Sequence, residues 1–322
     1  MNTASAAHVP VMLDRVRDLL APALEVADAV LVDATLGRAG HARALLGDHP
    51  RLRLIGIDTD QAAIEASRQM LAADLNRVTL VRAVYDQIPA IVAELGYQFV
   101  QGILFDLGVS SPQLDDPSRG FSYAKDAPLD MRMDRTGGLT AAEVVNTYPP
   151  GRLARVLAEY GEERFAGRIA DAIAAERARE PIGSTSRLAE IIKTSIPAPA
   201  RRAGGNPAKR SFQALRIEVN DELGALERAV PAALDRIAVG GRIVVLSYHS
   251  LEDRIIKRTF ARRSSDTTPP GLPVPLPDHR PQFRLLTSGA ERPGGAELAV
   301  NPRAASARLR AAQRVRAVGT AA

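Results

Sequence analysis

Short apolar runs alternate with helical patterns over the first 106 residues of the chain. Four runs have strand character, at residues 29–33, 53–58, 78–81 and 102–106. Helical spacing of apolar positions separates them, at residues 40–46, 60–73 and 88–95. Strands that alternate with helices form a parallel sheet with helices on both faces. The pattern therefore predicts an α/β fold with a doubly wound sheet.

The alternation stops after Asp106 and returns near Ile217. Residues 109–150 are loop-rich, and two amphipathic helical stripes follow between 152 and 179. We interpret residues 112–212 as a helical insertion. It divides the α/β domain into a first part, 1–111, and a second part, 213–322.

The second part resumes the strand–helix pattern. It predicts a long helix over 217–237, a turn at Gly240-Gly241, a strand over 242–247 and a helix over 251–261. Residues 282–287 have the character of an edge strand. Residues 308–315 either pair with the sheet or fray.

Composition places the chain among globular proteins, with 46% hydrophobic and 25% charged residues. No apolar stretch approaches the roughly 18 residues of a membrane span, and residues 1–9 lack secretory character. We therefore expect a cytoplasmic protein with no membrane partner. The absence of cysteine excludes disulfides and thiolate zinc sites.

The net charge of +5 permits a nucleic-acid partner without requiring one. Arginine supplies most of the positive charge, and its planar guanidinium suits contacts to phosphates and base edges. A compositional bias of the genome explains the arginine excess equally well.

A glycine-containing turn, residues 33–41, joins the first strand to the next helix and carries the strongest local signal. Glycine lets the backbone approach a ligand closely, and the helix N-terminus offers free N–H groups. The next strand ends at Asp58, where a carboxylate can hold both hydroxyls of a ribose. A third strand ends at Asp106. A tight turn without any ligand is the alternative.

The spacing Gly37-x-Ala39-Gly40 departs from the dinucleotide pattern, which has three glycines. Asp33 would repel a pyrophosphate but suits an ammonium group. The turn therefore favours S-adenosylmethionine over a nicotinamide cofactor.

Motifs through most of the chain resemble the bacterial 16S ribosomal RNA (cytosine-N4)-methyltransferase H family. They are His8–Leu13, Asp33–His41, Asp106–Asp116, Arg119–Ser122, Pro128–Asp134, Tyr160–Phe165, Ser211–Ile217, Ser247–Arg254 and Asn301–Arg303. The resemblance implies a class I methyltransferase fold, Rossmann-like, whose inserted helical domain helps to recognise the cytidine. It implies methyl transfer from S-adenosylmethionine to N4 of a cytidine in the decoding centre, within 16S rRNA or the small ribosomal subunit.

The resemblance also implies a set of donor-binding residues. They are Ala39, Gly40, His41, Asp58, Tyr85, Asp106 and Gln113. Ala39 replaces the usual glycine, which crowds the turn, and Tyr85 replaces the usual phenylalanine, which keeps an aromatic face for adenine.

Cytosine N4 is a poor nucleophile, so an acceptor for its proton would aid the reaction. Ser110-Ser111-Pro112 is similar to the short motif of other amino-methyltransferases, although Gln113 replaces their second proline. We hypothesise that Ser111 and neighbouring carbonyls hold the amine, with Asp115, Asp116 and Asp130 as lesser candidates. A plain turn role for Ser111 is the alternative.

Aromatic and basic residues are candidates for binding the RNA. They are Phe121 and Tyr123 for the flipped base, Arg201, Arg202, Lys209 and Arg210 for phosphates, and His249 for phosphate or loop orientation. The alternatives are core packing, solvated charge and, at Ser250, a helix cap. His41 and His249 lack a third ligand at metal spacing, so we expect no catalytic zinc, although carboxylates between 115 and 134 could hold magnesium.

Three other functions remain compatible with parts of the pattern: a nicotinamide oxidoreductase, a DNA amino-methyltransferase and a non-catalytic ribosome-assembly factor. The irregular glycine turn counts against the first. The sequence leaves a monomer and a homodimer equally open.

Overall fold

A computed structural model describes residues 9–202, 206–269 and 279–317. For Ser111, Arg201 and Arg202 it describes the backbone alone. The chain forms two compact units. The first combines Met1–Gly108 with Ala225–Ala322, and the second is Val109–Gly224.

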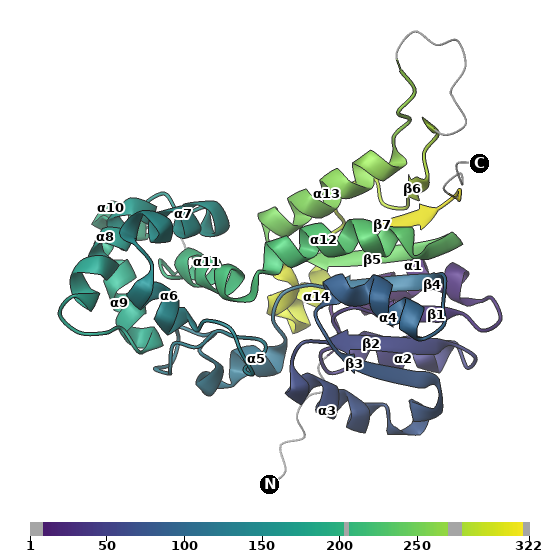
Figure 1. Cartoon of the computed structure of the whole chain (residues 1–322), viewed down its shortest axis with the longest axis horizontal. Coiled ribbons are helices and arrows are strands. Elements are labelled where there is room, and N and C mark those ends of the chain that lie inside the picture. The colour runs from purple at the N-terminus through teal and green to yellow at the C-terminus, as the bar shows by residue number, and fades with distance from the viewer. Residues whose placement is uncertain (1–8, 203–205, 270–278, 318–322) are drawn as a thin grey trace. The chain divides into compact units, whose positions relative to one another are not determined.

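The first unit is built on a sheet that, within the described residues, has seven strands in the order β3-β2-β1-β4-β5-β7-β6 (Figure 1). Their bounds are β1 Val30–Asp33, β2 Arg53–Asp58, β3 Val78–Arg82, β4 Val100–Asp106, β5 Ile237–Ser247, β6 Phe283–Leu285 and β7 Arg308–Arg314. Strands β3, β2, β1, β4 and β5 are parallel, whereas β7 is antiparallel to β5 and β6. The predicted Rossmann-like α/β fold is confirmed.

Helices cover both faces of the sheet, which explains why its central strands are apolar throughout. In β1, Leu31 packs into one core while Val30 and Val32 pack into the other, because successive side chains point to opposite faces. The first core includes residues of α1 (Leu13–Leu24), α2 (Gly40–Asp48) and α3 (Gln61–Met70). The second includes residues of α4 (Ile88–Glu94), α12 (Glu222–Asp235) and α13 (Ser250–Ser264).

The strand order reverses direction between β1 and β4. From β1 the chain proceeds outward to β2 and β3, and β4 then starts the other half of the sheet. In open α/β sheets, ligands bind outside the carboxyl ends of the strands at this switch point. The topology therefore directs attention to the residues that end β1 and β4.

Two predicted elements differ from the structure. The predicted helix over 217–237 is two helices, α11 (Lys209–Asn220) and α12, because Asp221 adopts a left-handed conformation with φ 48° and ends α11. Gly240 and Gly241 lie inside β5, where the pairing with β4 shifts register, and do not form a separate turn. Residues 308–314 pair on both sides, as β7, and β6 is the predicted edge strand.

The second unit is helical and has its own apolar core. Its helices are α5 Ser111–Asp115, α6 Ala141–Thr147, α7 Pro150–Gly161, α8 Ala166–Arg177, α9 Thr185–Ser195, α10 Ala198–Arg202 and α11. Gly161 allows α7 to approach α11 closely, because a Cβ there would lie 2.7 Å from the carbonyl oxygen of Arg210. The predicted insertion border at residue 212 would therefore divide a helix that packs inside this unit.

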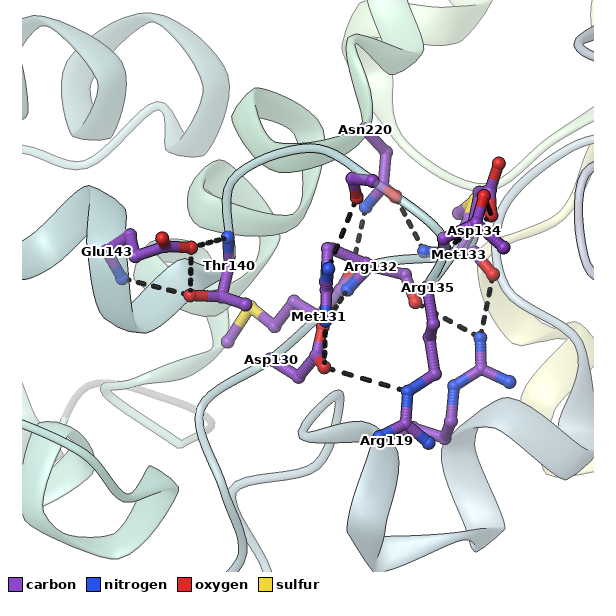
Figure 2. A network of polar contacts seen from close by, with 12 residues as sticks. Arg119, Asp130, Met131, Arg132, Met133, Asp134, Arg135, Thr140, Glu143 and Asn220 are labelled. Carbon is purple, nitrogen blue, oxygen red and sulfur yellow. Dashed lines mark hydrogen bonds and ion pairs between the residues drawn. The ribbon is translucent and has the colours of Figure 1, made fainter.

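A polar network fixes the long connection before α6 (Figure 2). Asn220 of α11 accepts a hydrogen bond from the Met133 N–H and donates one to the Met131 carbonyl, both at 2.8 Å. Arg119 donates to the carbonyls of Arg132 and Met133. These bonds hold the connection without regular secondary structure, which allows Met131 its buried left-handed conformation, φ 63°.

Candidate active site

Three carboxylates end neighbouring parallel strands of the first unit. Asp33 ends β1, Asp58 ends β2 and Asp106 ends β4. Because β1 lies between β2 and β4, the three residues share the carboxyl edge of the sheet at its switch point. Asp33 is buried, whereas the Asp106 side chain is about one quarter exposed. The predicted juxtaposition of these strand ends is present.

Asp58 fixes the glycine turn that follows β1. Its Oδ2 accepts a hydrogen bond from the Gly37 N–H at 2.8 Å, and its Oδ1 accepts one from the Asp60 N–H at 2.9 Å. Ser67 donates to the Gly37 carbonyl at 2.8 Å. Each carboxylate oxygen has two lone pairs, so Asp58 can hold this turn and also accept hydroxyls from a ligand.

The turn is crowded where α2 begins. Ala39 is fully buried in a left-handed conformation with φ 59°, which strains a residue that has a Cβ. A Cβ on Gly40 would lie 2.6 Å from Cγ of Pro10. The turn thus has the tightness expected at a position where alanine replaces glycine.

Asp106 is held from several directions. Its backbone N–H donates to Thr35 Oγ1 at 2.6 Å. The Tyr248 hydroxyl donates to Asp106 Oδ1 at 2.6 Å, and His41 Nδ1 lies 3.6 Å from Asp106 Oδ2. His41 Nε2 lies 3.0 Å from the Val11 carbonyl. Two side chains and one loop therefore orient the Asp106 carboxylate.

Tyr248 is a site residue that the sequence did not identify. Burial and the negative charge of Asp106 raise its pKa well above its usual value, so it stays protonated and remains a donor. Its position directly after β5, the strand that pairs with β4, was the available signal.

The electrostatics of the cluster favour a cationic ligand. Burial raises the pKa of Asp33 to about 7; the charges of Asp106 and Asp58 raise it further, and a hydrogen bond from Thr35 opposes the shift. Burial also raises the pKa of Asp58. A positive group placed among these carboxylates would relieve both desolvation and mutual repulsion.

Tyr85 lies at the same edge of the sheet, directly after β3 in the short helix Tyr85–Gln87. Its ring packs edge-to-face on Phe105, with 5.7 Å between centroids. A half-buried aromatic ring near Asp58 can pack against a base.

The remaining predicted donor and catalytic residues, Ser111, Gln113 and Asp115, belong to α5 of the second unit. Gln113 is buried, and its Oε1 accepts a hydrogen bond from the Ser110 N–H at 2.9 Å as part of a capping box. Asp115 is exposed, and the Ser111 side chain lies outside the described structure.

The predicted base-stacking residues differ in burial. Phe121 is 7% exposed in the core of the second unit, beside the guanidinium of Arg119. Its predicted role in stacking the base is corrected to core packing. Tyr123 is partly exposed and packs edge-to-face on Phe212, with 5.4 Å between centroids. Asp130 is paired with Arg132 at 2.8 Å, which leaves it a structural role (Figure 2).

The predicted phosphate contacts also differ. Lys209 and Arg210 are exposed at the start of α11, and the side chains of Arg201 and Arg202 lie outside the described structure. The His249 side chain is 8% exposed and caps α13, accepting from the Glu252 N–H at 3.5 Å. The cap expected at Ser250 is thus one residue earlier, and burial leaves His249 little surface for a phosphate.

Two searches of the described residues gave no hit. No helix there is long and apolar enough to cross a membrane. No cluster of three or more metal-ligating side chains was found in the same residues.

Comparison with known proteins gives concordant results. The family model of the MraW methylase family matches residues 5–315. A protein of Thermobifida fusca named Ribosomal RNA small subunit methyltransferase H is 64% identical over 315 residues, which is 98% of this chain and 96% of that protein. A protein of the same name from Streptomyces avermitilis is 59% identical, covering 96% of this chain and 97% of its own length.

Solved structures are more distant. An rRNA methylase from Streptococcus thermophilus is 14% identical, covers 94% of both chains and has a TM-score of 0.40. A likeness at this level carries no argument about the site.

Proposed function

Because the chain belongs to the MraW methylase family, we propose that it methylates the exocyclic N4 of a cytidine in the decoding centre of 16S rRNA, in the cytoplasm, with S-adenosylmethionine as donor. The observation that supports this most is the cluster of Asp33, Asp58 and Asp106 at the switch point of the sheet. Its raised pKa values call for a cation, and a sulfonium donor carries a positive sulfur and an ammonium group.

The residues of the first unit fit such a donor. Asp58 has lone pairs for the ribose hydroxyls, and Asp33 matches the ammonium group. The ring of Tyr85 can pack against the adenine. When bound, the donor supplies a methyl group already activated on sulfur, so the main task of the protein is positioning.

Tyr248 is expected to act as a positioning residue for the donor. Tyr248→Phe removes the hydroxyl that fixes Asp106, so we expect the Kd for S-adenosylmethionine to rise roughly tenfold with little change in KM for RNA. Isothermal titration calorimetry measures the first and steady-state kinetics the second.

Tyr148→Phe provides the matched control. It removes a similar hydrogen bond, 2.8 Å from the Tyr148 hydroxyl to Glu218 in the second unit. Equal donor affinity in Tyr248→Phe and wild type, or an equal loss in both variants, would rule out a positioning role.

The amine of the target base must lose a proton as the new C–N bond forms. We propose that Ser111, at the start of α5, accepts a hydrogen bond from that amine together with nearby backbone carbonyls. Asp115 is the alternative acceptor on the same short helix.

Ser111→Ala is expected to lower kcat by about a hundredfold and to leave the donor Kd unchanged. Single-turnover kinetics with saturating donor measure the effect. Near-normal turnover would exclude Ser111 as the acceptor, and Asp115→Asn would then be the next variant to measure.

The second unit is proposed to recognise the substrate. Tyr123 offers a partly exposed aromatic ring for an unstacked base, and Lys209 and Arg210 offer exposed charge for phosphates. Each of these residues lies in the unit that interrupts the methyltransferase sheet.

Mass mapping of small-subunit RNA tests the proposed function. Unmethylated small subunits and free 16S rRNA are incubated separately with enzyme and isotopically labelled donor. We expect one labelled cytidine in the decoding region of at least one substrate. Label on DNA alone, or donor binding without label in either RNA, would contradict the proposal.

A further inference from the structure

One face of α13 carries exposed positive charge. Lys257, Arg258 and Arg262 are exposed, whereas Ile256 and Phe260 on the opposite side are buried against the sheet. We call Lys257, Arg258 and Arg262 the basic face of α13. The helix itself lies on one face of the sheet, beside β6 (Figure 1).

The acidic residues of α13 do not neutralise this face. Glu252 is 3% exposed and accepts hydrogen bonds from the N–H groups of Tyr248 and His249. Asp253 is paired with Arg310 at 2.7 Å. In the described part of the chain, no side chain forms an ion pair or hydrogen bond with the basic face.

The arrangement is unfavourable for the helix by itself. Arg254, Arg258 and Arg262 follow one another at intervals of four residues, so like charges are neighbours along one side. The helix dipole stabilises Arg262 in the last turn but not Arg258, which lies further from the C-terminus. An anionic partner would remove this repulsion.

Chemistry on this face favours a polyanion over a lipid surface. The exposed side has no aromatic or large aliphatic side chain to insert into a bilayer. Arginine and lysine are the residues that contact phosphates in protein–RNA interfaces.

The position of the helix connects this face to the candidate active site. Helix α13 starts three residues after Ser247 ends β5, at the carboxyl edge that holds Asp106. With about 1.5 Å of rise per residue, it extends for roughly 22 Å from that edge.

We propose that the basic face of α13 binds the phosphate backbone of the substrate rRNA, next to the nucleotide that is methylated. The inference rests on the proposed function, because it assigns a second contact surface to the same RNA.

The test compares two double variants of the full-length enzyme. Arg258→Gln with Arg262→Gln removes two charges from the basic face while keeping residues that favour a helix. Arg51→Gln with Arg53→Gln removes two exposed arginines at the start of β2, the opposite edge of the sheet. Binding to unmethylated small subunits is measured between about 0.05 and 0.2 M salt.

The basic-face variant is expected to bind about tenfold more weakly at low salt, and its salt slope should fall by roughly 1.5 to 2, at 0.7 to 0.9 per phosphate contact. The control variant should keep the wild-type slope. Melting temperature and donor Kd should remain unchanged in both variants.

Equal slopes for the basic-face variant and wild type would overturn the inference. So would a loss confined to vesicles of anionic phospholipid, because the face would then serve a membrane. Failure of the proposed function has a different signature, in which the wild-type enzyme itself neither binds the subunits nor labels their RNA.

Discussion

Asp58→Ala is expected to weaken S-adenosylmethionine binding at least a hundredfold, which corresponds to about 3 kcal/mol. The substitution removes an acceptor for the ribose hydroxyls. It also leaves the Gly37 and Asp60 N–H groups without the carboxylate that now binds them at 2.8 and 2.9 Å. Hydrogen bonds to charged groups contribute about 1.5 to 3 kcal/mol each, so the loss of more than one accounts for the expected size. Isothermal titration calorimetry measures the affinity.

Asp60→Asn is the matched control, because Asp60 lies in the same connection two residues away. The Asp60 carboxylate caps α3 by accepting from the Ala62 N–H at 3.0 Å, and asparagine caps a helix about as well. We expect near wild-type donor affinity for Asp60→Asn. A similar loss in both variants would mean that the connection is merely sensitive to substitution, and unchanged affinity in Asp58→Ala would disprove the assigned role.

Asp33→Asn is expected to have opposite effects on stability and on binding. At pH 8 it should raise the free energy of unfolding of the ligand-free protein, by as much as about 4 kcal/mol, because it removes a buried charge whose pKa is about 7. The same substitution should weaken donor binding more than tenfold, because it removes the negative charge that matches the ammonium group. Asparagine is nearly isosteric with aspartate and can still accept the hydrogen bond from the Thr35 N–H.

The pH dependence of stability gives the sign. The pKa of Asp33 rises from 3.8 in the unfolded chain to about 7 in the folded protein, so the folded state favours the protonated form. Its contribution to stability is fully present below pH 4 and is lost as the pH rises to about 7. The difference in unfolding free energy between wild type and Asp33→Asn should therefore grow across this window and level off above it.

Urea denaturation at several pH values measures this difference, and titration with the donor at pH 6 and pH 8 measures the coupling. Donor affinity of the wild type should increase with pH across this range more than that of Asp33→Asn. A pH-independent difference in stability between the two proteins would show that Asp33 is not a buried carboxyl of raised pKa.

Local signals predicted the donor side of the site. The strand ends at Asp33, Asp58 and Asp106 follow from short apolar runs that each finish in an acid, and parallel strands bring such ends to one edge. The bond between Asp58 and Gly37 joins residues 21 positions apart, within a single strand–helix–strand unit. Sequence spacing is informative at that range.

Long-range contacts could not be predicted in the same way. Tyr248 lies 142 residues from Asp106, and their contact depends on β5 pairing beside β4 after the second unit has intervened. Phe121 lies in a polar loop, which suggested exposure, but the network around Arg119 and Asn220 folds that loop onto the core of its unit. The break at Asp221 was missed because apolar spacing continues through both helices while one backbone conformation separates them.

A crystal structure of the enzyme with S-adenosylmethionine tests the central claim most directly. We predict that the donor lies at the carboxyl ends of β1, β2 and β4, with its ribose hydroxyls bound by Asp58 and its ammonium group within hydrogen-bonding distance of Asp33. A donor bound at another part of the chain, or a bound donor with the carboxylates of Asp58 and Asp106 turned away from it, would contradict the account.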